Sequence, residues 1–173
     1  MPFSRNQASL DTNILYYFHA VGRLDLIWAL FPEGVWIDPA VLQEIRIEFG
    51  ADLETYLSEQ GLVFQIERQF EDRHYVEMAE IKTRRRGLKH ADIVTIVVAG
   101  KQGVTCLSAD EPVRKTCEER QIPFARHLGC LEEAIKRGLL GDEEALILLK
   151  GFLDEGLYLP RSLVEDFRQC RKL

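Results

Sequence analysis

The sequence predicts an α/β fold, a three-layer α/β/α sandwich built around a mainly parallel central sheet. Short runs of β-branched and apolar residues alternate along the chain with longer amphipathic patterns. That alternation places helices on both faces of a parallel sheet. The 173 residues, of which 46% are hydrophobic and 29% charged, are also enough to bury one substantial core.

The elements follow in order along the chain. Strands are expected over residues 8–10, 35–37, 62–66, 104–107 and 122–125. Helices are expected over residues 12–20, 23–30, 40–49, 52–60, 72–86, 111–120, 131–137, 143–153 and 160–170, several of them ended by Gly or Pro. Thr12 is the expected N-cap of the first helix, and Asp38-Pro39 opens the third. Residues 91–99 favour a strand by propensity, but their place just before another strand favours a buried helix, which we expect.

Composition and missing motifs exclude several classes. The net charge of -6 argues against coating nucleic acid by bulk charge, although a local basic path remains compatible with it. No apolar run reaches the ~20 residues of a membrane helix, and the first residues form no apolar signal core, so we expect a cytoplasmic protein without membrane contact. The four cysteines form no C-x-x-C pair, which favours free thiols over a zinc site or a disulfide scaffold.

Phosphate-binding and dinucleotide-binding motifs are absent as well. There is no G-x-x-x-x-G-K-[ST] loop and no G-x-G-x-x-G after the first strand. A phosphatase of the haloacid-dehalogenase type needs a second aspartate two residues after the first, and here Asn13 follows Asp11. A phosphoacceptor receiver domain needs paired acids at its first strand, and these are also absent.

Four acidic residues stand where parallel strands end or where the following helices begin. Asp11 directly follows the first strand and Asp110 follows the 104–107 strand. Glu44 falls about one turn inside the helix after the second strand, and Asp92 falls in the first turn of the helix over residues 91–99. Helix capping, dipole stabilisation or a solvated helix surface explains each of them singly. Together they predict a carboxylate cluster, which stays ionised only around a hard cation such as Mg²⁺ or Mn²⁺. Such an ion supports phosphodiester hydrolysis by acidifying a water and stabilising charge on the phosphate.

The acidic segments resemble PIN-domain nucleases over residues 8–140. The matching pieces, in the order of that family, are Ser9-Leu10-Asp11-Thr12-Asn13-Ile14-Leu15, Val41-Leu42-Gln43-Glu44-Ile45, Leu88-Lys89-His90-Ala91-Asp92-Ile93 and Cys106-Leu107-Ser108-Ala109-Asp110. The tail, with Gly138-Leu139-Leu140 and Leu157-Tyr158-Leu159-Pro160-Arg161-Ser162-Leu163, is similar to the helical tail of a VapC-toxin-like branch. The sequence departs from the family at Ile93, at Glu111 and in the 126–129 loop.

The resemblance implies a metal-dependent endoribonuclease. Residues 1–140 would form the PIN-like nuclease domain, and residues 141–173 a helical C-terminal extension packed on the same domain. Asp11, Glu44, Asp92 and Asp110 would be catalytic, with Asp11, Asp92 and Asp110 holding Mg²⁺ or Mn²⁺ and Glu44 completing the cage or orienting a water. Asn13 and Ser108 would orient these carboxylates by hydrogen bonds, and Glu111 would share the site of Asp110.

A basic stretch precedes the third acid. Arg84, Arg85, Arg86 and Lys89 would grip RNA phosphates, or they simply form the basic end of a helix. His127 lies past the last strand and is expected to be structural or surface-exposed, with a general-acid role as the alternative.

Partners and competing functions complete the expectations. The expected partners are RNA, an antitoxin protein as in toxin-like members of the family, and a second copy of the chain. The apolar face of the last helices would bind the antitoxin or the second copy, or would pack on the domain itself. The alternatives are an RNA-processing nuclease without an antitoxin, a non-catalytic binding module, and other metal-dependent phosphate chemistry.

Overall fold

A four-stranded parallel sheet forms the centre of the molecule. The computed structural model describes residue 3 and residues 6–171. Its strands are β1 (Gln7–Leu10), β2 (Gly34–Trp36), β3 (Thr105–Leu107) and β4 (Phe124–Ala125), in the order β2-β1-β3-β4. All three strand pairs are parallel, with Ser9 opposite Trp36 on one side and opposite Cys106 on the other. The expected α/β class with a parallel sheet is thereby confirmed.

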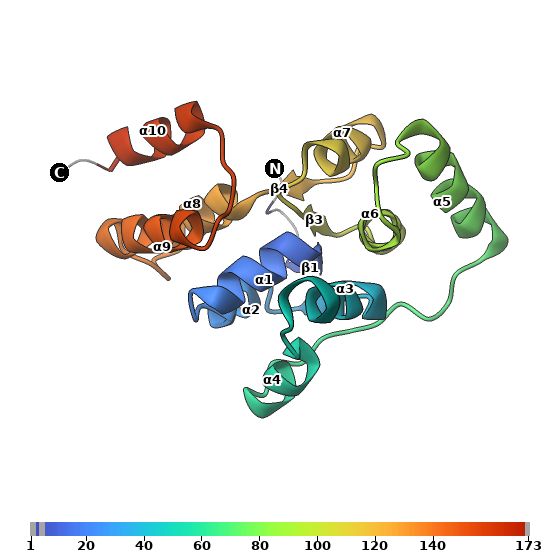
Figure 1. Cartoon of the computed structure of the whole chain (residues 1–173), viewed down its shortest axis with the longest axis horizontal. Coiled ribbons are helices and arrows are strands. Elements are labelled where there is room, and N and C mark those ends of the chain that lie inside the picture. Colours follow the sequence, from blue (N-terminus) through green and yellow to red (C-terminus); the bar gives the residue numbers. More distant parts are fainter. Residues whose placement is uncertain (1–2, 4–5, 172–173) are drawn as a thin grey trace.

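Helices surround this sheet (Figure 1). In the described part of the chain they are α1 (Thr12–Ala20), α2 (Leu24–Leu30), α3 (Pro39–Phe49), α4 (Leu53–Glu59), α5 (Asp72–Arg84), α6 (His90–Gln102), α7 (Glu111–Glu119), α8 (His127–Lys136), α9 (Asp142–Asp154) and α10 (Arg161–Gln169). No helix among the described residues is long and apolar enough to span a membrane.

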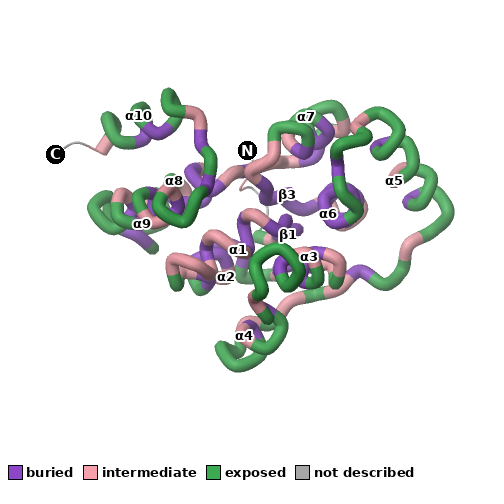
Figure 2. The backbone as a smooth tube through the Cα atoms, viewed as in Figure 1, coloured by how far each residue is buried: buried purple, intermediate pink, exposed green. Residues whose placement is uncertain are grey.

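Two apolar clusters, one on each face of the sheet, define the three layers. Because side chains alternate along a strand, neighbouring residues enter different clusters. On β3, Leu107 joins the cluster under α1, α2, α3, α8, α9 and α10, whereas Cys106 joins the cluster under α5, α6 and α7. Figure 2 shows the buried backbone concentrated in β1, β3, α6 and the inner sides of the surrounding helices. The three-layer α/β/α sandwich is confirmed.

Helix α6 shows burial overriding β propensity. Every residue from Ala91 to Ala99 is buried, so its β-branched side chains pack on both sides of the helix. Gly103 ends α6 at a φ of +64°, a left-handed conformation that glycine adopts without strain, and turns the chain into β3. The expected helix is confirmed and extends from His90 to Gln102.

Two local expectations were wrong. Asp11, rather than Thr12, is the N-cap of α1, since its side chain accepts the Thr12 backbone N–H and Thr12 is the first helical residue. Residues 62–66 form no strand but only an isolated bridge between Gln65 and Trp36. Two residues after this bridge, at Asp38-Pro39, the chain already enters α3, so β2 is too short to pair with more of residues 62–66.

The C-terminal helices pack on the same core as the first helices. The ring of Phe152 in α9 meets the ring of Phe18 in α1 edge to face, with centroids 4.9 Å apart. Gly151 faces Val21 at the end of α1, where an added Cβ would lie 2.9 Å from a Val21 methyl group. A small residue therefore sets how closely α9 approaches α1.

Candidate metal centre

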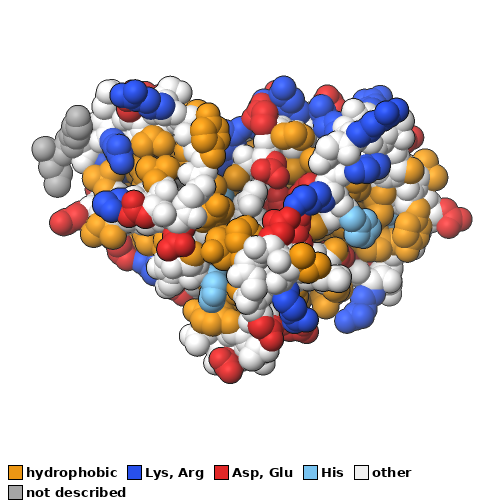
Figure 3. Space-filling model, in the orientation of Figure 1, with side chains coloured by type: hydrophobic (Ala, Val, Ile, Leu, Met, Phe, Trp, Pro, Cys, Tyr) orange, Lys and Arg blue, Asp and Glu red, His pale blue; other side chains and the backbone are white. Residues whose placement is uncertain are grey.

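Three aspartates from three segments converge where the strands end. Asp11 follows β1, Asp92 lies in the first turn of α6, and Asp110 follows β3 and caps α7. One carboxylate oxygen from each lies within 4.8 Å of the others. Asp11 and Asp92 are buried, whereas Asp110 is partly exposed. In the space-filling view, acidic side chains gather near the centre of the face where α1, α3, α6 and β3 meet (Figure 3).

Hydrogen bonds from neighbouring residues hold two of these carboxylates, those of Asp11 and Asp110, in place. Asp11 Oδ1 accepts the Thr12 backbone N–H at 2.7 Å, and Asp11 Oδ2 accepts the Ser108 hydroxyl at 2.6 Å. Asn13 donates its side-chain amide to Asp110 Oδ1 at 3.1 Å. Ser108 Oγ in turn accepts the Asp110 backbone N–H at 3.1 Å, so one hydroxyl joins two of the aspartates.

The third carboxylate is held by the start of its own helix. Asp92 Oδ2 accepts the backbone N–H of Lys89 at 2.7 Å, which orients the carboxylate across the first turn of α6. Deeper in the core, Ser9 donates its hydroxyl to the Thr95 carbonyl at 3.0 Å and ties β1 to α6. The two elements that carry Asp11 and Asp92 are therefore joined directly.

Burial and mutual repulsion destabilise the ionised forms of the three aspartates. Burial and the negative charge of Asp92 raise the pKa of Asp11 from 3.8 to about 8. Burial, together with the charges of Asp110 and Glu44, raises the pKa of Asp92 to about 6 despite the Lys89 hydrogen bond. Burial and Glu44 also raise the pKa of Asp110.

In the described part of the chain the charge of Lys89 acts on Asp92 and Asp110 from nearby, but no cation pairs with the three aspartates. Among the residues that the structure describes, no Lys or Arg forms an ion pair with Asp11, Asp92 or Asp110. Three clustered carboxylates, two of them buried, with raised pKa values and no partner cation, fit a divalent ion bound by oxygen ligands.

Glu44 lies beside this cluster but is bound to other groups. Thr12 donates its hydroxyl to Glu44 Oε2 at 2.5 Å, and Lys89 Nζ lies 2.7 Å from Glu44 Oε1. Burial opposes ionisation of Glu44, but the hydrogen bonds from Lys89 and Thr12 outweigh it and lower its pKa. Lys89 also pairs with Glu48, one turn further along α3, and these two glutamates raise the pKa of Lys89. No pattern in the sequence indicates the contact between Thr12 and Glu44.

The remaining acid and arginines named from the sequence lie in other contacts. Glu111 pairs with Arg114 at 2.5 Å and with Arg126 at 2.5 Å, and Arg114 lowers the pKa of Glu111 to about 2. Arg85 donates to Thr116 and pairs with Glu119 on α7. Arg84 and Arg86 are exposed at the end of α5 and in the turn that leads to α6.

His127 begins α8 and is fully buried. Its ring lies parallel to Phe18 at 5.8 Å and edge-on to Phe152, while Nε2 lies 3.3 Å from the Asn13 carbonyl. Burial lowers the pKa of His127 to about 4, even though the Asn13 carbonyl favours the protonated ring. This aromatic packing fits the structural role expected for His127.

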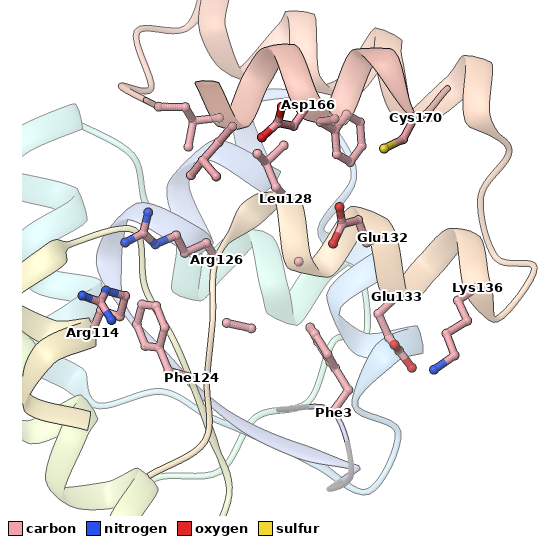
Figure 4. Close-up of a pocket in the computed structure, with 15 residues that line it drawn as sticks. Phe3, Arg114, Phe124, Arg126, Leu128, Glu132, Glu133, Lys136, Asp166 and Cys170 are labelled. Carbon is pink, nitrogen blue, oxygen red and sulfur yellow. The ribbon is translucent and has the colours of Figure 1, made fainter. Parts of the chain in front are cut away.

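An apolar groove is a second feature of the molecular surface (Figure 4). Its volume is about 770 Å³, and it lies between β4, α7, α8 and α10. Phe124, Leu128 and Phe167 form apolar parts of its wall, and Arg114 and Arg126 stand at the end that also contacts Glu111. The three aspartates are not part of its lining, so the groove is a separate surface rather than the carboxylate site itself.

The fold and the carboxylate cluster together define the PIN class, an α/β/α sandwich with acidic residues at the carboxyl ends of parallel strands. A protein family described as a PIN domain matches residues 8–172. The chain belongs to this PIN-domain family. No curated protein matches the sequence.

Proposed function

We propose that this protein is a metal-dependent endoribonuclease that hydrolyses RNA phosphodiester bonds, and that it acts as the toxin of a toxin–antitoxin pair. The observation that carries the nuclease proposal is the cluster of Asp11, Asp92 and Asp110, held within 4.8 Å at the strand ends of a PIN fold. Asp11, Glu44, Asp92 and Asp110 are the proposed catalytic residues.

Each residue has a proposed task. Asp11, Asp92 and Asp110 would hold Mg²⁺ or Mn²⁺, which when bound acidifies a water and stabilises charge on the phosphate. Ser108 and Asn13 hold the carboxylates of Asp11 and Asp110 in fixed orientations through the hydrogen bonds described above. Glu111, which directly follows Asp110, would share the site of that residue, and its side chain pairs with Arg126 and Arg114.

RNA would reach the cluster past basic side chains. Arg84 and Arg86 are exposed just before α6, and Arg85 and Lys89 belong to the same stretch. Contacts of this kind bind phosphates without reading sequence. The choice of RNA over DNA and the toxin role rest on the resemblance to the VapC-like branch.

The partner surface and the domain boundary are proposals as well. We place the boundary at residue 140, with α9 and α10 as the extension packed on the nuclease domain. An antitoxin segment with apolar side chains would find a suitable surface in the groove between α8 and α10.

The first test is cleavage of a labelled panel of structured RNAs by the purified protein, with Mn²⁺, Mg²⁺ or EDTA. Asp11→Asn removes one proposed ligand charge. Asp154→Asn is a matched control because Asp154 is exposed on the surface of α9, where it pairs with Lys150. We expect metal-dependent cleavage by the wild type and the control, and none by Asp11→Asn. Equal cleavage by Asp11→Asn would contradict the assigned site.

The toxin role has a separate test in living cells. Induced expression of the wild type should arrest growth, and co-expression of the protein from a neighbouring short reading frame should restore it. Growth unaffected by an active nuclease would favour the RNA-processing role instead.

A further inference from the structure

Lys89 is placed unusually for a lysine. It is the N-cap residue of α6, where Ser, Thr, Asp and Asn are preferred and where the helix dipole is positive. Lys89 therefore caps α6 more weakly than a Ser, Thr, Asp or Asn would, and its positive charge is repelled by the positive end of the helix dipole. Local rules are most often broken in this way at functional sites.

The ammonium group of Lys89 is held by two carboxylates from another helix. Nζ lies 2.7 Å from Glu44 Oε1 and also pairs with Glu48, the residue one turn further along α3. The other oxygen of Glu44 accepts the Thr12 hydroxyl, so both oxygens of this carboxylate are occupied. Glu44 is not one of the acidic residues whose oxygens converge within 4.8 Å; that group consists of Asp11, Asp92 and Asp110.

The same lysine is tied to the metal centre through its backbone. Its N–H donates to Asp92 Oδ2, and Thr12, the other partner of Glu44, directly follows Asp11. The pair of Glu44 and Lys89 therefore borders the aspartates on the side of α3 and α6. In Figure 3 basic side chains lie directly beside the central acidic group.

A second positive charge beside the phosphate can stabilise the charge that develops there during phosphodiester hydrolysis. Many nucleases use two divalent ions about 4 Å apart, one on each side of the phosphate. A second ion on the α3 side would need carboxylate oxygens from that helix, and both Glu44 and Glu48 bind Lys89 through one oxygen each.

We propose that Lys89 takes the place of a second metal ion, so that this protein works with one divalent ion in the three-aspartate site and one fixed ammonium. The proposal rests on the proposed nuclease function. In the reaction a water oxygen bonds to phosphorus, the bond from phosphorus to the leaving oxygen breaks, and the proton of the water passes to the leaving oxygen. Lys89 donates a hydrogen bond to a phosphate oxygen as charge grows there, and it keeps its own proton.

The test counts bound ions directly, without substrate. Free Mn²⁺ gives a sharp electron paramagnetic resonance signal that disappears on binding, so a titration of the full chain yields ions bound per molecule. We expect one Mn²⁺ on the wild type and two on Lys89→Met, because Glu44 and Glu48 are then free. Adding Glu48→Gln to Lys89→Met should return the count to one. The control is the single variant Lys150→Met, which breaks a surface pair on α9 and should bind one Mn²⁺ like the wild type.

RNA cleavage provides a second readout. At Mn²⁺ concentrations that fill only the three-aspartate site, we expect Lys89→Met to lose about 100-fold in rate, comparable to the loss of one preorganised charge-stabilising donor. Lys89→Arg should retain more activity and a count of one. The dependence of rate on Mn²⁺ should be first order for the wild type and steeper for Lys89→Met.

The outcomes separate the two proposals. Two Mn²⁺ ions on the wild type, or a single ion on a folded Lys89→Met, would overturn the role of Lys89 but leave the nuclease proposal intact. If Lys89→Met does not fold, the counts for the wild type and Lys89→Arg decide. A wild-type protein that binds no Mn²⁺ would overturn the metal-dependent nuclease proposal itself.

Discussion

The raised pKa of Asp11 predicts that the metal-free protein loses stability as the pH rises. In the folded state the carboxyl keeps its proton up to about pH 8, whereas in the unfolded chain it releases the proton near 3.8. Between these values the folded state binds more protons, so the free energy of unfolding falls with increasing pH. From pH 6.5 the loss is about 1.4 kcal/mol per pH unit, and it levels off as the pH approaches 8, so the total is roughly 1.5 kcal/mol.

Asp11→Asn removes this dependence while retaining the cap. The amide oxygen of Asn can accept the Thr12 N–H, and its NH₂ group can donate to Ser108 Oγ. The variant should therefore show a flatter stability profile than the wild type and exceed it at pH 8. A divalent ion should stabilise the wild type by about 2.7 kcal/mol at 100 times its dissociation constant, and it should stabilise the variant far less.

Urea unfolding in EDTA at pH 6.5, 7.25 and 8, repeated with Mn²⁺, measures both effects. Asp154→Asn is the control and should follow the wild type at every pH, since Asp154 is exposed on α9. A metal-free wild type whose stability stays constant or rises over this range would refute the claim that the three carboxylates are strained.

Three further predictions concern other parts of the molecule. His127→Phe should remove an acid-induced loss of about 3 kcal/mol between pH 6.5 and 4, seen in urea unfolding, because the folded protein holds His127 neutral down to about pH 4 while the unfolded chain protonates near 6.5. Gly151→Val should destabilise the protein by about 1–3 kcal/mol, since its side chain meets Val21, and thermal unfolding would show the lower midpoint. Arg84→Ala with Arg86→Ala should weaken RNA binding uniformly across sequences and reduce the salt dependence of binding by about one contact for each arginine, which filter binding at several salt concentrations measures.

Much of the fold could be predicted because the signals for it are local: the alternation of strand-like and helix-like patterns, and the Gly, Pro and capping residues that end the elements. The strands ending at Asp11 and before Asp110, and the helix after Asp38-Pro39, all follow from short-range signals. The prediction of a strand over residues 62–66 was wrong for a non-local reason. A strand needs a paired neighbour, and these residues form only one bridge to β2, between Gln65 and Trp36. The alternation of half-buried and exposed side chains persists there without a ladder.

The site was predictable only in part. The carboxyl ends of parallel strands share one edge, which is why Asp11 and Asp110 were expected together. The link from Lys89 to Glu44 and Glu48 joins helices about 40 residues apart, and no spacing in the sequence encodes it. Arg85 likewise looked like part of a phosphate-binding run, but its partners lie on α7, which only tertiary packing reveals.

Capping and metal binding are not competing explanations for Asp11 and Asp92. Each carboxylate accepts a backbone N–H at the start of a helix, from Thr12 in α1 and from Lys89 in α6. Such a bond fixes the rotation of the carboxyl group and so delivers a preorganised oxygen to the cluster. The sequence cannot separate the two roles because one side chain performs both. They separate in variants: Asn at position 11 should keep the helix start and lose the ion, whereas Ala should lose both and be less stable by a further 1 kcal/mol or so, the usual contribution of a cap.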